Sequence, residues 1–155
     1  MKKVFILMAF ILIIALPLMA ANPVRANGFG AGIALGYPSG VTVRYGMDNF
    51  RFFGTVGNHY GADVSLDLGA LYDIVSFDIG GLPLYLNAGA QLGVGLGFGG
   101  GDLVFGMSAA GVVGVSYYLD KQPVEFFLNV APGYRFLGGS GFAISSNLGG
   151  IWYFN

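Results

Sequence analysis

From residue 27 onward, apolar and polar side chains alternate with a period of two in most segments of the chain. Segment 62–74 is the clearest, because only Leu71 breaks its alternation. A helix would spread the three aspartates of this segment around its circumference, whereas a strand places them on one side. The pattern therefore predicts a strand with one apolar and one polar face. The apolar face holds Ala62, Val64, Leu66, Leu68, Ala70, Tyr72 and Ile74, and the polar face holds Asp63, Ser65, Asp67, Gly69 and Asp73.

Two further long segments repeat this period. In 82–98 the leucines and valines occupy one face, and every position on the other face after Tyr85 is polar or glycine. In 124–136 one face is apolar, and the other includes Glu125, Asn129 and Arg135. Pro132 lies in this last segment, and because proline has no amide hydrogen we expect a bulge or a local loss of pairing there.

Turn-forming residues divide the chain after residue 26 into eight expected strands. A chain of mean hydropathy +0.69 with only 10% charged residues has more apolar surface than a water-soluble core of this size needs. In hydrocarbon every backbone amide needs a partner within the protein, so a lipid-facing sheet must close on itself. We therefore predict an all-β fold, an eight-stranded antiparallel up-and-down transmembrane β-barrel. The expected strands are 28–36, 41–47, 50–59, 62–74, 82–98, 103–119, 124–137 and 141–154.

The first 26 residues have the features of a signal peptide. Lys2 and Lys3 precede an almost uninterrupted apolar stretch from Val4 to Met19, and Val24 and Ala26 are small residues at the −3 and −1 positions of a cleavage site. We expect removal of 1–26, with Ala20 or Ala21 as alternative cleavage points and an uncleaved helical anchor as the alternative fate. Residues 27–155 then form the β-barrel of a protein exported to the bacterial outer membrane.

Charge and cysteine content exclude several classes of function. The expected mature chain keeps four basic and eight acidic residues, a net charge of −4 that argues against a nucleic-acid partner. The absence of cysteine excludes disulfides, thiolate metal sites and lipid attachment to cysteine. The Gly-rich stretch 97–102 lacks the lysine and the following helix of a phosphate loop. We expect no cofactor and no metal site.

A helical architecture is the alternative to the barrel. Gly93, Gly97 and Gly101 are spaced by four, as are Gly106, Ala110 and Gly114, and such spacing is typical of packed membrane helices. Polar residues within the same segments and the two-residue period of the aspartates favour strands.

The last strand carries the most specific motif. Asn147, Gly149, Trp152 and Phe154 fit a pattern of polar residue, glycine and two aromatics that resembles the C-terminal assembly signal of outer-membrane barrels. Asn155 follows where the aromatic residue is usually last. An interfacial aromatic girdle accounts for Trp152 and Phe154 equally well.

Three other segments extend this resemblance: 36–41, 82–86 and 123–133. With the last strand they resemble a family of small bacterial outer-membrane β-barrels of unassigned function, of the eight-stranded type. The resemblance implies the fold and the location, with outer-membrane lipid and the barrel-assembly machinery as partners. It implies no catalytic residues.

Charged residues at inward positions form the candidate site. An eight-stranded barrel is only wide enough inside for side chains to fill it, so we expect three cations and four anions to meet there as a structural polar network that blocks the lumen. These residues are Arg44, Arg51, Asp63, Asp67, Asp73, Glu125 and Arg135. The alternative is a thin water path beside the inward glycines.

The expected function is that of an integral outer-membrane protein with a structural or envelope-surface role and no enzyme activity. A surface adhesin or ligand-binding barrel is the second hypothesis, with its extracellular ligand unknown, and a narrow pore is the third. A lipid-modifying enzyme is the fourth, because His59 is the only histidine and lies at the expected outer rim. No serine lies close to His59 in the sequence to complete a catalytic pair.

Overall fold

The computed structural model describes residues 27–59, 62–99, 102–119 and 121–154. The expected signal peptide lies outside the described residues. Within them, no helix is long and apolar enough to cross a membrane. The strands are β1 (Gly28–Gly36), β2 (Ser39–Met47), β3 (Phe50–His59), β4 (Ala62–Ile79), β5 (Leu82–Gly99), β6 (Asp102–Tyr118), β7 (Val124–Leu137) and β8 (Gly141–Tyr153).

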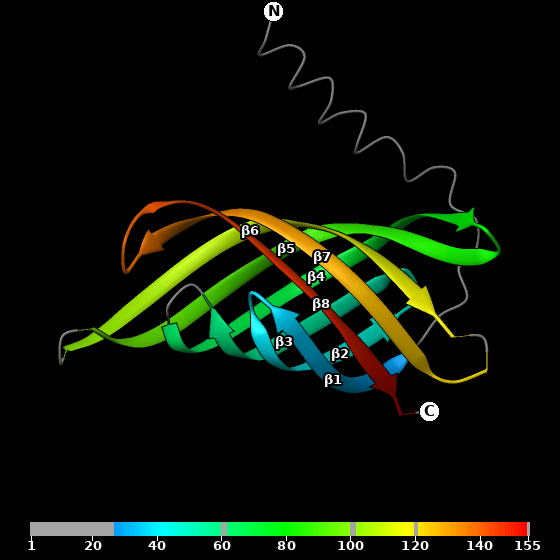
Figure 1. The fold of residues 1–155 in the computed structure, drawn as a ribbon, viewed down its shortest axis with the longest axis horizontal. Coiled ribbons are helices and arrows are strands. Elements are labelled where there is room, and N and C mark those ends of the chain that lie inside the picture. Colours follow the sequence, from blue (N-terminus) through cyan, green and yellow to red (C-terminus); the bar gives the residue numbers. More distant parts are fainter. Residues whose placement is uncertain (1–26, 60–61, 100–101, 120, 155) are drawn as a thin grey trace, which may run out of the picture.

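These eight strands form one closed antiparallel ring in chain order, because β1 pairs with both β2 and β8 (Figure 1). Gly30 is paired with Tyr153 and Gly36 with Asn147. The expectation of an all-β, eight-stranded, up-and-down fold is confirmed. The helical alternative is wrong, because the two glycine-rich segments are the strands β5 and β6.

The ring has two ends, which we call proximal and distal. The proximal end holds the start of β1, the end of β8, the turns at 48–49 and 80–81, the end of β6 and the start of β7. The distal end holds the connections at 37–38 and 138–140, the ends of β3 and β5 and the starts of β4 and β6. β4 and β5 have 18 residues each, whereas β1 and β2 have nine each, so one wall of the ring is much longer than the other (Figure 1).

The expected end of β4 at residue 74 is wrong, because the strand continues to Ile79. Its ladder with β5 contains a bulge between Asp73 and Val75. The extra residue, Ile74, is buried and not on the outer face as the alternation predicted. A bulge reverses the alternation beyond it, so the sequence pattern ends there while the strand continues.

The expected loss of pairing at Pro132 is present on one side of β7. β7 remains paired with β8 at this residue, whereas its ladder with β6 lapses between the pairs Ala110–Gly133 and Val113–Val130. The register is the same on both sides of this gap, so the strands separate locally without slipping.

The distribution of apolar and polar side chains is the reverse of that in a water-soluble protein. Large apolar residues cover the outside, and Phe142 is 70% exposed. The inside holds buried polar and charged side chains together with a smaller number of apolar ones. Exposed apolar residues occur on every strand, and examples are Ile33, Val41, Phe52, Leu68, Leu92, Phe105, Leu128 and Ile144.

The interior is stacked in layers along the ring axis. Buried charged side chains lie toward the proximal end, and they contact a buried cluster that includes Tyr85, Tyr118 and Tyr153. A second apolar cluster lies next to it toward the distal end and comprises Phe53, Leu71, Val112 and Ala131. The interior is therefore filled by side chains in both layers.

Candidate functional site

Glu125 is the centre of a buried group of charges inside the ring. It is the second residue of β7, it lies close to the proximal end, and it is fully buried. Its Oε1 atom lies 2.6 Å from Arg44 Nη1 and accepts a hydrogen bond of 2.6 Å from Ser116 Oγ. Its Oε2 atom accepts a hydrogen bond of 2.6 Å from the Tyr153 hydroxyl. Both carboxylate oxygens are thus satisfied by groups from β2, β6 and β8.

Arg51 links this carboxylate to a second one. Its Nη1 atom lies 3.8 Å from Glu125 Oε1, and its other terminal nitrogen forms an ion pair with Asp73. The group therefore contains two cations and two anions, Arg44, Arg51, Asp73 and Glu125, which we call the ion cluster. Its formal charge is balanced, and this offsets part of the cost of removing four charges from water.

Aromatic rings complete the surroundings of both arginines. The Arg44 guanidinium carbon lies 3.9 Å from the centre of the Phe127 ring and 6.0 Å from that of Phe53. The Arg51 guanidinium carbon lies 5.3 Å from the centre of the Tyr118 ring. These cation–π contacts hold the guanidinium groups across the interior. The sequence could not show which cation each ring would face.

The remaining predicted network residues lie apart from the ion cluster. Asp67 is buried six positions further along β4 toward the distal end and accepts a hydrogen bond of 3.2 Å from Ser65 Oγ. Asp63 lies further still and is exposed, and Arg135 is half-buried near the distal end of β7. The ion cluster thus joins four of the seven predicted residues, and Asp63, Asp67 and Arg135 lie further toward the distal end.

Asn87 and Ser116 were not predicted as site residues, yet they connect the ion cluster to the rest of the interior. The Asn87 side-chain amide donates to Ser116 Oγ at 3.1 Å, and Ser116 donates to Glu125. The polar residues on the inward faces of β5 and β6 were the available signal. The pairing of Asn87 with Gly114 and of Tyr85 with Ser116 sets the register that brings them together.

The C-terminal motif lies on the closing strand. Asn147 points inward and its Oδ1 atom accepts a hydrogen bond of 3.3 Å from Asn129. A side chain at Gly149 would collide with the backbone of Ile33, so a glycine is needed where β8 closes on β1. Trp152 and Phe154 point outward. The motif thus has a structural role in the ring as it stands.

His59, the candidate general base, is the last residue of β3 and is paired with Ala62. No group of three His, Asp or Glu side chains in the described part of the chain is arranged to hold a metal ion. The chemistry that this interior supports is charge pairing, which stabilises the closed ring.

Comparison with known protein families, curated proteins and solved structures finds no match to this chain. The neutral ion cluster joins four strands, β2, β3, β4 and β7, through buried side chains, and it therefore ties distant parts of the ring together.

Proposed function

We propose that the mature chain is an integral β-barrel protein of the bacterial outer membrane with a structural role in the envelope. The observation that supports this most directly is the reversed distribution of side chains, with the ion cluster buried inside and phenylalanine, leucine and valine exposed outside. In water such an exterior would drive aggregation, whereas in hydrocarbon it is the favourable arrangement.

Strand lengths support the same proposal. A membrane strand needs about 9–11 residues when tilted, and β1, β2 and β3 have nine, nine and ten. The ring has no open edge, so no strand exposes unpaired backbone along its whole length to lipid. On this proposal the proximal end faces the periplasm, and outer-membrane lipid and the barrel-assembly machinery are the partners.

The layered interior favours a structural role over a pore. Leu71 and Val112 are each 1% exposed and lie across the interior beside the ion cluster. A continuous water path would have to pass through both layers. Only a few residues separate successive strands at the distal end, which leaves little projecting surface for an adhesin.

The deciding experiment combines heat modifiability with circular dichroism. The full-length gene is expressed with its own leader, the outer-membrane fraction is isolated, and the protein is run on gels with and without boiling. We expect a faster-migrating unboiled band and a β-rich spectrum in detergent. A protein found in the soluble fraction, or a spectrum dominated by helix, would contradict the proposal.

The lipid-modifying alternative has its own test. His59→Ala is compared with the parent protein by mass spectrometry of outer-membrane lipid from cells that express each. We expect identical lipid profiles, because no serine lies two residues from His59 in the sequence to act as a nucleophile. A modification that is present with the parent protein and absent with the variant would establish an enzyme.

A further inference from the structure

The two sides of the ring differ in height. β1 and β2 have nine residues each and form the short wall, whereas β4, β5 and β6 have 18, 18 and 17 residues and form the long wall (Figure 1). A strand tilted by about 40° rises by about 2.5 Å per residue along the axis of a barrel. The short wall is therefore about 22 Å high, and the long wall is about twice as high.

Most of this difference lies at the distal end. Backbone hydrogen bonds join the proximal ends of β1, β8, β7 and β6 to one another, and these ends are therefore level. The bonds run from the Phe154 N–H to Phe29, from the Tyr153 N–H to Pro123 and from the Leu119 N–H to Val124. From this level end β1 extends for nine residues and β6 for 17.

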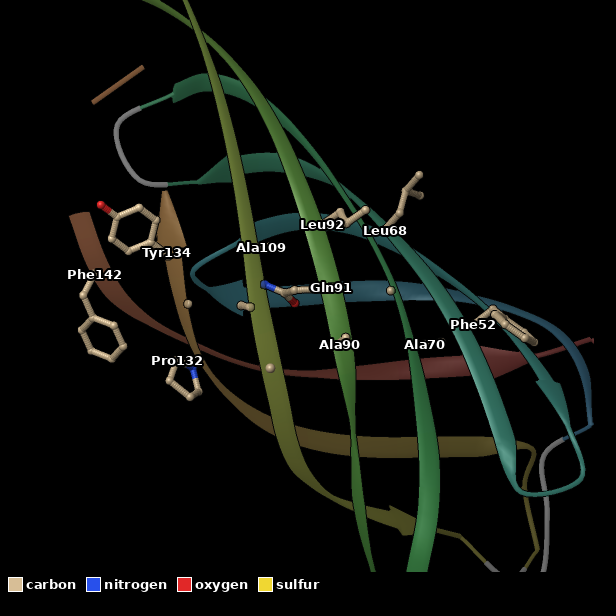
Figure 2. Close-up of a pocket in the computed structure, with 14 residues that line it drawn as sticks. Phe52, Leu68, Ala70, Ala90, Gln91, Leu92, Ala109, Pro132, Tyr134 and Phe142 are labelled. Atoms are coloured by element: carbon tan, nitrogen blue, oxygen red, sulfur yellow. The ribbon is translucent and has the colours of Figure 1, made fainter. Parts of the chain in front are cut away.

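Exposed apolar side chains follow each wall toward its distal end. On the short wall the aliphatic ones end with Leu35 of β1 and Val41 of β2. On the long wall they continue to Leu103 and Phe105, close to the start of β6. An apolar groove on the outside of this wall, bordered by Leu92, belongs to the same surface (Figure 2). The surface that hydrocarbon can cover is thus low on one side of the ring and high on the other.

Backbone pairing ends at a similar level beside the short wall. The pairing of β8 with β1 stops where the Tyr37 N–H donates to the Ser146 carbonyl oxygen at 2.7 Å. Alternate residues of a strand direct their N–H and C=O groups to the same side, so those of Ile144 and Phe142 point to where β1 has already ended. Within the described residues, these two positions of β8 are paired only with β7.

These unpaired backbone groups limit how far hydrocarbon can rise beside the short wall. Each such group is costly in hydrocarbon, and together they lose more there than the exposed Phe142 and Ile144 side chains gain. Polar surroundings therefore reach down to about the level of Ser146. On the long wall β5 and β6 stay paired as far as Gly99 and Asp102, so no such limit applies there.

We propose that the ring thins the bilayer beside β1 and β2, and that this side of the protein contacts lipid whose acyl chains are short or disordered. This inference rests on the proposed membrane location. The apolar side chains of β1 from Phe29 to Leu35 span about 15 Å of height, whereas the apolar band of an outer-membrane barrel is about 25 Å tall. A tilt of the whole ring cannot remove this difference, because it leaves the height of each wall unchanged. Bilayers adapt to a short apolar surface by thinning.

The test measures the depth of spin labels at matched positions on the two walls. The chain has no cysteine, so one introduced cysteine carries one nitroxide label. Ile33 and Val113 are both exposed, and each lies five residues from the proximal end of its strand. Ile33 lies three residues from the distal end of β1, whereas Val113 lies eleven residues from that of β6. A flat bilayer would therefore place both labels at the same depth.

The protein is expressed with its own leader, purified from the outer-membrane fraction and reconstituted in phosphatidylcholine vesicles. Electron paramagnetic resonance gives the depth of each label below the nearest polar interface, from its accessibility to oxygen and to a water-soluble nickel complex. We expect the label of Ile33→Cys to be about 5 Å shallower than that of Val113→Cys, because the interface lies only three residues away. Leu35→Cys and Gly111→Cys should show the same order, since each lies seven residues from the proximal end.

The length of the lipid chains gives a second comparison. In dilauroyl-, dimyristoyl- and dioleoylphosphatidylcholine, the depth of the Val113→Cys label should increase with chain length. The depth of the Ile33→Cys label should stay nearly constant, because the short wall sets the local thickness. Phe29→Cys and Tyr117→Cys are the control pair, each one residue from the proximal end of its strand, and we expect equal depths for them.

Equal depths for Ile33→Cys and Val113→Cys in every lipid would overturn the proposal, because the bilayer would then be flat around the ring. Unequal depths for the control pair would also overturn it, since a tilted ring in a flat bilayer would account for the difference. Each labelled variant is first required to keep the heat-shifted band. A parent protein that lacks this band and does not enter vesicles would instead contradict the membrane location itself.

Discussion

Tyr153, the last residue of β8, donates a hydrogen bond of 2.6 Å to Glu125, the second residue of β7. The hydroxyl and the carboxylate are both fully buried. The strand that closes the ring is therefore fastened to the ion cluster by its final side chain.

Removal of this hydroxyl should destabilise the protein measurably. For Tyr153→Phe we expect a loss of about 2 kcal/mol in the free energy of unfolding, because a hydrogen bond to a buried charge is lost while the ring is kept. Urea unfolding in detergent, followed by Trp152 fluorescence, measures it. Tyr134→Phe is the control, since the Tyr134 side chain is exposed and the same atom is removed. Equal effects of the two changes would contradict the role of the Tyr153 hydroxyl.

The ion cluster should tolerate the loss of a pair better than the loss of one member. Glu125→Leu leaves two buried arginines with Asp73 as their remaining counterion in the cluster, and we expect a cost of about 3–5 kcal/mol. Arg44→Met together with Glu125→Leu restores charge balance and should recover most of that stability. A double-mutant cycle of unfolding free energies makes the comparison. A double variant that is less stable than the single one would show that the surroundings of Arg44 need its charge.

Two glycines of β6 should respond differently to the same change. A Cβ at Gly114 would collide with the side chains of Asn87 and Asn129, which occupy the space that this glycine leaves inside the ring. Gly114→Ala should therefore cost about 1–3 kcal/mol through overpacking. A Cβ at Gly111 meets open space, so Gly111→Ala should be neutral or slightly stabilising. Thermal unfolding of both variants tests this, and an equal loss at both sites would contradict the inward placement of Gly114.

The parent protein should not conduct ions. Leu71, Val112 and the ion cluster fill successive layers of the interior, so purified protein in planar bilayers should stay at baseline current. Discrete conductance steps that scale with the amount of protein added would contradict this expectation. They would also revive the narrow-pore hypothesis.

The sequence predicted the strands well where alternation is uninterrupted, as in Leu82–Gly99, because one face meets a different environment from the other. It failed at Ile74, since a one-residue bulge reverses the faces and hides the rest of β4 from a pattern search. The inward direction of Arg44 and Glu125 followed from alternation alone. Their pairing did not, because they are 81 positions apart and meet only through the registers of the strands between them. The groove was also out of reach, because it combines residues from six strands.

The pairing of Gly30 with Tyr153 has a consequence for assembly. Neighbouring strands elsewhere in the ring are joined by short turns, whereas this contact joins the two ends of the expected mature chain. The entropy cost of closing so long a loop makes β1–β8 pairing the slowest contact to form. Until β1 and β8 pair, the sheet has two unpaired edges. Their backbone N–H and C=O groups would have no hydrogen-bond partner in hydrocarbon. For the proposed outer-membrane protein, insertion into the membrane and the pairing of β8 with β1 therefore have to occur together.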